Sequence, residues 1–187
     1  VRTLDGTTGS LLSTIEPPQD SLEFGTRAAE LGDVSADGTP DFLVTDAFGP
    51  ASNLALGVAM AVSGRDHSIL WAHSGRRGSD PDAAGQPSFF GNVITPAAAD
   101  LNGDGIRDIV VAAHVQYVDG VGNEAGEVTA LNGQTGAALW SLSGARALEL
   151  LGVNLAFAGD MNGDGIEDVL AGAPQHFGSG LVLGGVG

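Results

Sequence analysis

The chain has 187 residues, of which 43% are hydrophobic and 30 are glycine, and it contains no cysteine. This composition suits one buried core reached through many tight turns, and it excludes a disulfide framework and thiol catalysis. The formal net charge of −16, from 23 acidic residues against seven arginines, argues against nucleic acid and anionic lipid as partners.

The N-terminal segment reads as a β-hairpin. Its sequence, VRTLDGTTGSLL at 1–12, matches the later segment 128–139. An alternating strand, a polar turn and a second strand are typical of a hairpin. We therefore expect residues 1–15 to be the outer hairpin of a repeat unit.

The first complete unit is expected at 24–75. It opens on Phe24-Gly25 and a strand rich in small side chains, which suits the crowded inner edge of a repeat array. An acidic loop at 33–41 follows, then the apolar exit Phe42-Leu43-Val44, then a hairpin at 57–71. Four strands per unit is the content of a β-propeller blade.

The same order of elements recurs twice more. The segment 126–140 aligns without gaps on 57–71, and further acidic loops begin at 100 and 160. Spacings of this size with strand-like contents indicate a propeller or another repeat array. The sequence therefore predicts an all-β fold of four-stranded antiparallel blades, about three of them, in a partial propeller or fragment. We expect one blade at 90–144 and a partial blade at 151–187.

Each acidic loop places side-chain oxygens at positions 1, 3, 5 and 9, and a glycine at position 6. Position 7 adds a backbone carbonyl. This spacing lets a short loop wrap a hard cation. The predicted metal ligands are Asp33, Ser35, Asp37, Thr39 and Asp41 in the first loop, Asp100, Asn102, Asp104, Ile106 and Asp108 in the second, and Asp160, Asn162, Asp164, Ile166 and Asp168 in the third.

The donor chemistry favours Ca²⁺, with up to three ions per chain. Ca²⁺ takes six to eight oxygen ligands, whereas Mg²⁺ prefers fewer protein ligands, and the absence of histidine and cysteine from the loops argues against Zn²⁺. The alternative is that these are ordinary Asp-Gly turns. That alternative has most weight at 33–41, where Ser35, Ala36 and Pro40 depart from the other two copies.

An EF-hand does not fit these loops. It requires a bidentate glutamate at position 12 and flanking helices. Position 12 is Val44, Val111 or Ala171, and the residues that follow each loop read as a strand.

The arrangement resembles the FG-GAP repeat of integrin alpha-chain β-propellers and their bacterial relatives. The resemblance rests on Phe24-Gly25, on Phe90-Gly91, on the three acidic loops, and on Gly172-Ala173-Pro174 after the third. Leu151 stands where the third repeat would have phenylalanine. The resemblance implies Ca²⁺ in the loop between the first two strands of each blade.

Three functions follow as hypotheses. The first is a non-catalytic, calcium-binding module at the cell surface or outside the cell, with the periplasm also open, which binds a protein or glycan ligand or further propeller blades. The second is part of a Ca²⁺-dependent propeller enzyme acting on polysaccharide or phosphate. The third is a structural subunit of a surface filament or layer. No direct membrane insertion is expected, because no apolar run approaches 18 residues.

The sequence shows no convincing catalytic group. It has no Gly-x-Ser-x-Gly, and its four histidines, although His114 and His176 follow equivalent strands, have no recurring acidic or serine neighbour. Trp71 and Trp140 occupy matching repeat positions, which indicates repeated packing, or alternatively a platform for sugar rings.

Overall fold

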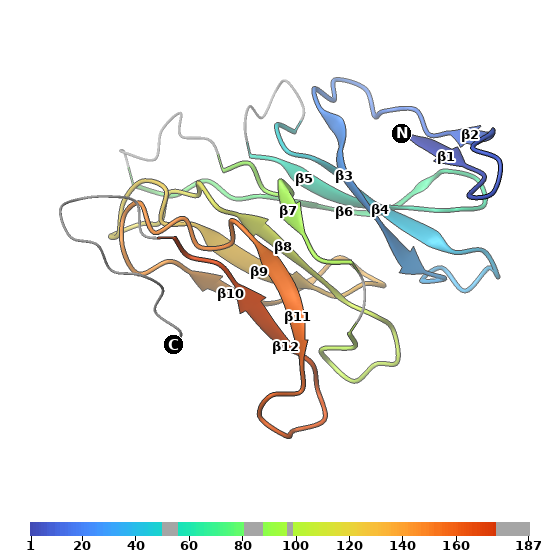
Figure 1. Ribbon diagram of the computed structural model, residues 1–187. Coiled ribbons are helices and arrows are strands. Elements are labelled where there is room, and N and C mark those ends of the chain that lie inside the picture. Colours follow the sequence, from blue (N-terminus) through green and yellow to red (C-terminus); the bar gives the residue numbers. More distant parts are fainter. Residues whose placement is uncertain (50–55, 81–87, 97–98, 175–187) are drawn as a thin grey trace.

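The computed structural model describes residues 1–49, 56–80, 88–96 and 99–174, and the description below is confined to them. This part of the chain is built from strands alone and has no helix that could cross a membrane (Figure 1). Two four-stranded antiparallel sheets lie between two two-stranded ones. The predicted fold class, all-β with four-stranded propeller blades, is confirmed.

The two complete sheets have their strands in chain order. The first blade contains β3 (Phe24–Gly32), β4 (Asp41–Asp46), β5 (Val58–Val62) and β6 (Ile69–Ser74). The second contains β7 (Val93–Ile94), β8 (Ile109–Ala113), β9 (Glu127–Leu131) and β10 (Ala138–Ser143). The flanking pairs are β1 (Arg2–Leu4) with β2 (Leu11–Thr14), and β11 (Leu155–Gly159) with β12 (Asp168–Ala171).

The blades stack through alternate faces of their middle strands. In β8 every residue is buried, but the odd and even positions face different neighbours. Ile109 and Val111 pack in a cluster with Leu43 of the first blade, whereas Val110 packs in a separate cluster with Leu155 of β11. Since side chains alternate along a strand, an apolar run such as 109–113 is what a sheet with two covered faces requires.

The Phe-Gly positions join one blade to the next. Gly57 forms a parallel bridge with Phe90, and Gly126 forms the same bridge with Leu151. A Cβ atom at Gly57 or Gly126 would lie 2.1 or 2.3 Å from the carbonyl oxygen of that partner, so each site admits only glycine. Leu151 is 7% exposed and Phe90 is 3% exposed. Leucine therefore occupies the same buried position as phenylalanine, although it departs from the Phe-Gly pattern.

The three hairpins share one turn. Gly9, His67 and Gly136 each have a positive φ, and each donates its N–H to the carbonyl oxygen four residues earlier, at 2.8, 3.0 and 2.8 Å. The predicted equivalence of 1–12, 57–71 and 126–140 is therefore confirmed at the level of hydrogen bonds. In Figure 1 the β1–β2 hairpin lies at one end of the stack and β11–β12 at the other.

Candidate metal-binding loops

The three acidic loops have the same backbone conformation. Each connects the first two strands of a blade, and strands, not helices, flank every copy, which confirms that they are not EF-hands. Positions 4 and 6 both have positive φ: 59° and 87° at Ala36 and Gly38, 77° and 85° in the second loop, and 82° and 89° in the third. Two left-handed residues in a fixed register fold the loop tightly over its first side chain.

The aspartate at position 1 organises this fold. Asp100 accepts the N–H groups of Gly103 and Gly105, each at 2.7 Å, through its two different oxygens. Asp160 does the same with Gly163 and Gly165, while Asp33 accepts the N–H groups of Asp37 and Gly38. Two N–H groups from the middle of the turn thus converge on the position-1 carboxylate in every copy.

Positions 3, 5 and 7 lie further round the turn. The N–H groups of Thr39, Ile106 and Ile166 donate to the position-5 aspartates Asp37, Asp104 and Asp164 at 2.8, 2.7 and 2.8 Å. Asn102 and Asn162 also donate a side-chain N–H to that aspartate, at 2.9 and 3.0 Å. Ser35 instead donates its hydroxyl to Asp33, at 3.4 Å.

Position 9 distinguishes the two four-stranded sheets from the β11–β12 pair within the described residues. Asp41 and Asp108 have no exposed surface, and each accepts an N–H from the outer hairpin of its own blade, from Gly64 at 3.0 Å and Gly133 at 2.9 Å. Asp168 is half-buried, and its donors within the described residues, Met161 and Asn162, belong to its own loop.

The electrostatics of the second loop show an excess of negative charge. Burial raises the pKa of Asp108, and the nearby charges of Asp104 and Asp100 raise it further, although the N–H groups of Gly133 and Leu101 oppose that shift. The N–H of Ile106 and the amide of Asn102 lower the pKa of Asp104, and the N–H of Gly165 is the main cause of the lowered pKa of Asp160. A bound cation would offset the repulsion among these carboxylates.

The donors fit a hard cation by chemistry. Every predicted ligand is an oxygen, as Ca²⁺ prefers. In loop 100–108 the charges of Asp104 and Asp100 also raise the pKa of Asp108. In the part of the chain that the structure describes, no three Asp, Glu, His or Cys side chains are already gathered into a metal-binding cluster. Binding would therefore draw side chains of an already folded loop inward.

A residue outside the three acidic loops donates a hydrogen bond to loop 100–108. The Asn132 side chain, 7% exposed, donates its Nδ2–H to Asp104 Oδ2 at 2.6 Å. The contact joins residues 28 apart and depends on how the hairpin lies against the loop. No sequence signal identified it.

The histidines do not assemble a catalytic group within the described residues. His67 shares a hydrogen bond of 3.2 Å with Ser13, His73 contacts the carbonyl oxygen of Gly136 at 2.9 Å, and burial lowers the pKa of His114. His176, which follows a strand equivalent to the one before His114, lies outside the described residues.

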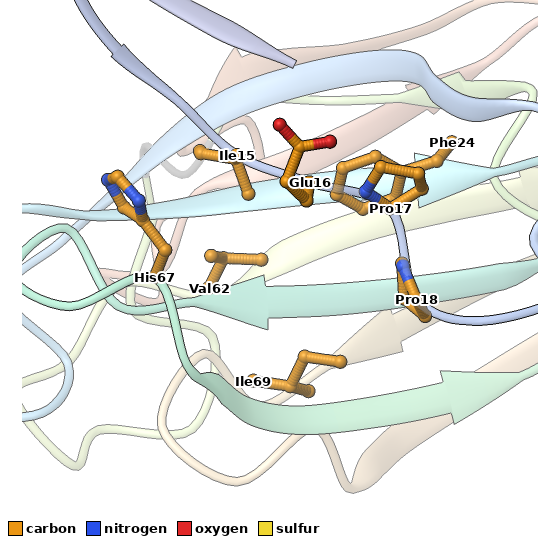
Figure 2. A pocket seen from close by; sticks show the side chains of 8 residues that line it. All are labelled: Ile15, Glu16, Pro17, Pro18, Phe24, Val62, His67 and Ile69. Carbon is orange, nitrogen blue, oxygen red and sulfur yellow. The ribbon is translucent and has the colours of Figure 1, made fainter.

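A small pocket of about 130 Å³ lies where the first hairpin meets the first blade. Ile15, Val62 and Ile69 line it, with His67 at one side. Figure 2 shows the Glu16 carboxylate pointing away from Val62 and Ile69, so the acid and the imidazole do not converge on the pocket.

The two tryptophans have different surroundings. Trp71 is 8% exposed, and its indole N–H donates to the carbonyl oxygen of Gly133 in the next blade at 2.9 Å. Trp140, at the matching repeat position, is 40% exposed. Trp71 is therefore an inter-blade packing residue, but the prediction of repeated packing is wrong at Trp140, whose side chain is exposed.

The sequence is similar to that of a known repeat family and to those of known proteins. The sequence profile of the FG-GAP repeat family matches residues 92–131 and 151–184. Integrin alpha-5 of Xenopus laevis is 31% identical over 161 residues, which cover 83% of this chain and 14% of that protein. Integrin alpha-4 of Xenopus laevis is 37% identical over 93 residues, 48% of this chain and 9% of that protein.

The chain thus spans 14% and 9% of the lengths of these two relatives. The matched profile, the similarity to integrin alpha chains and the stacked four-stranded sheets point to one family. The chain contains FG-GAP repeats of the integrin-like β-propeller type.

Proposed function

We propose that this chain is a calcium-stabilised, ligand-binding propeller region of an extracellular or cell-surface protein. The observation that carries the proposal is the shared backbone of the three acidic loops, which presents only oxygen donors in the same register. In each loop the side chains at positions 1, 3, 5 and 9 and the carbonyl at position 7 would hold one Ca²⁺.

The ion would supply charge neutralisation and rigidity, not chemistry on a substrate. Two carboxylates about 4 Å apart repel by ~4 kcal/mol at an effective dielectric of 20, and a bound divalent cation reverses that balance. A site filled at 100 times its dissociation constant adds ~2.7 kcal/mol to the free energy of unfolding. The calcium concentration outside cells suits weak loop sites of this kind, which supports an extracellular location.

Ligand binding is proposed from the family relationship. Loops on a rigid scaffold carry binding functions in many folds, and the proteins most informative here are integrin alpha chains. A protein or a glycan is the expected ligand class. Calcium-dependent retention of the protein on arrays of extracellular proteins and glycans, lost in chelator, would support this, and equal retention with and without calcium would argue against it.

Isothermal titration calorimetry tests the metal sites directly. Asp104→Ala and Asp164→Ala are each expected to remove one binding event and leave the remaining loops able to bind. Glu16→Gln, a change to an exposed acid far from the loops in sequence, is the control and should leave the number of sites unchanged. Loss of all binding in every loop variant would mean that the changes unfold the protein, and no binding by the unaltered protein would overturn the proposal.

A further inference from the structure

The three position-5 aspartates differ in how firmly they are held. Within the described residues, Asp37 accepts the N–H of Thr39, and Asp164 accepts the N–H of Ile166 and the amide of Asn162. Asp104 accepts the corresponding N–H of Ile106 and amide of Asn102, and in addition the amide of Asn132. Only the last donor comes from another part of the blade.

The orientation of the Asn132 amide follows from its other contacts. Its Oδ1 accepts three donors from its own turn, the N–H of Gln134 at 3.1 Å and the N–H and hydroxyl of Thr135 at 2.8 Å each. An oxygen must occupy that place, because those groups are donors. The Nδ2 group is therefore fixed on the side that faces Asp104.

The same turn contacts the metal loop and the preceding blade. The Gly133 N–H donates to Asp108 Oδ1, and the Gly133 carbonyl accepts the indole N–H of Trp71. Asn132 and Gly133 thus connect two carboxylates of loop 100–108 to the buried tryptophan of the first blade. A movement of Asp104 on binding an ion would be felt at Trp71 through two adjacent residues.

The equivalent residues of the other hairpins make the turn without this contact. Ser63 accepts the N–H groups of Arg65 and Asp66, and Asp5 accepts those of Thr7 and Thr8. Serine, aspartate and asparagine therefore all support this turn. What asparagine alone adds is the donor directed at Asp104.

We propose that Asn132 is a positioning residue for calcium in loop 100–108, restraining the orientation of Asp104 and coupling that site to the contact between the first two blades. This inference rests on the proposed calcium sites. Residues that orient a metal ligand typically change metal affinity by ~10–100-fold when they are replaced. Loop 100–108 is accordingly the tightest of the three sites.

The test uses the whole chain with the other loops silenced by Asp37→Ala and Asp164→Ala, and with Trp140→Phe, which leaves Trp71 as the single tryptophan. Ca²⁺ is titrated by calorimetry and by Trp71 fluorescence. Asn132→Ser, which copies the residue of the first blade, should weaken binding by about tenfold or more and speed release into chelator. Asp5→Ser makes the related turn change away from any acidic loop and should leave affinity unchanged.

The outcomes separate the two proposals. Failure of the silenced background to bind Ca²⁺ would overturn the proposed function together with this inference. Binding that Asp104→Ala abolishes but Asn132→Ser changes by less than about twofold would overturn the inference alone. A Trp71 signal that ignores Ca²⁺ while calorimetry detects binding would overturn the proposed coupling.

A second measurement does not depend on whether Asn132→Ser folds. In the silenced background, the side-chain amide of Asn132 should be protected from hydrogen exchange, and its NMR signal should shift at the calcium concentration that fills the site. An amide that exchanges freely and ignores Ca²⁺ would contradict the assigned role.

Discussion

The loops at 100–108 and 160–168 differ in sequence only at their second and eighth positions, yet their surroundings differ greatly. Their backbones agree, with matching positive φ values at positions 4 and 6. Asp108 is fully buried and accepts an N–H from the outer hairpin, whereas Asp168 is half-buried and is held by its own loop within the described residues. The loop sequence therefore sets local conformation, and the outer hairpin adds burial and extra hydrogen bonds.

The largest effect should come from removing the buried carboxylate. Asp108→Ala leaves the N–H groups of Leu101 and Gly133 without their acceptor, which should cost about 2–4 kcal/mol. Asp168→Ala should cost about 1 kcal/mol or less, because water can reach its donors. Urea denaturation in chelator measures both, and equal losses would show that the hairpin contact contributes nothing.

The tryptophans provide the same comparison at the outer strands. Trp71→Phe keeps most of the ring but leaves the Gly133 carbonyl without its donor, so we expect a loss of about 1–2 kcal/mol. Trp140→Phe, at the exposed equivalent, should change the free energy of unfolding by less than about 0.5 kcal/mol. A larger effect at Trp140 than at Trp71 would refute the assignment of Trp71 as the packing residue.

The first loop allows a stabilising change. Ala36 has a φ of 59°, where the later loops have glycine. Ala36→Gly relieves the left-handed conformation and should add about 0.5–1 kcal/mol, after allowance for the greater freedom of glycine in the unfolded chain. Gly103→Ala is the reverse change at the matching position and should destabilise. A destabilising Ala36→Gly, or a stabilising Gly103→Ala, would mean that the three loops do not share one conformation.

In chelator, the buried Asp108 should make a small contribution to the pH dependence of the free energy of unfolding. Since the pKa of Asp108 is raised above its ordinary value of 3.8, the unfolded chain releases that proton first as the pH rises. The contribution of Asp108 to stability is therefore present below that ordinary value and is lost as the pH rises through its folded pKa. Asp108→Asn should remove this loss, and an unchanged pH profile would contradict the raised pKa.

Much of the fold was predictable because the repeats carry it. Strand, acidic loop and hairpin recur in register, and the shared turn hydrogen bonds and positive φ values follow that register. Phe90 and Leu151 could be aligned before their contact with the preceding blade was known, because each is followed by a glycine and stands before an acidic loop.

Contacts that do not repeat were not predictable. Arg76 donates to both oxygens of Glu127 across the first two blades, and this pairing raises the pKa of Arg76. The residue equivalent to Glu127 in the first blade is Val58, so no repeat pattern marked it. The contact of Asn132 with Asp104 was not predictable for the same reason, because the equivalents of Asn132 are Ser63 and Asp5. Such pairs depend on where two sheets meet. The spacing of residues within one blade gives no information about that.

The most direct test of the calcium proposal is thermal unfolding of the unaltered chain in calcium and in chelator. At calcium about 100 times the dissociation constant, each filled site should add ~2.7 kcal/mol and raise the melting temperature by about 5–10 °C. Asp104→Ala should reduce the shift by the share of one loop. Superimposable unfolding curves in calcium and in chelator would contradict the claim that the three acidic loops bind this ion.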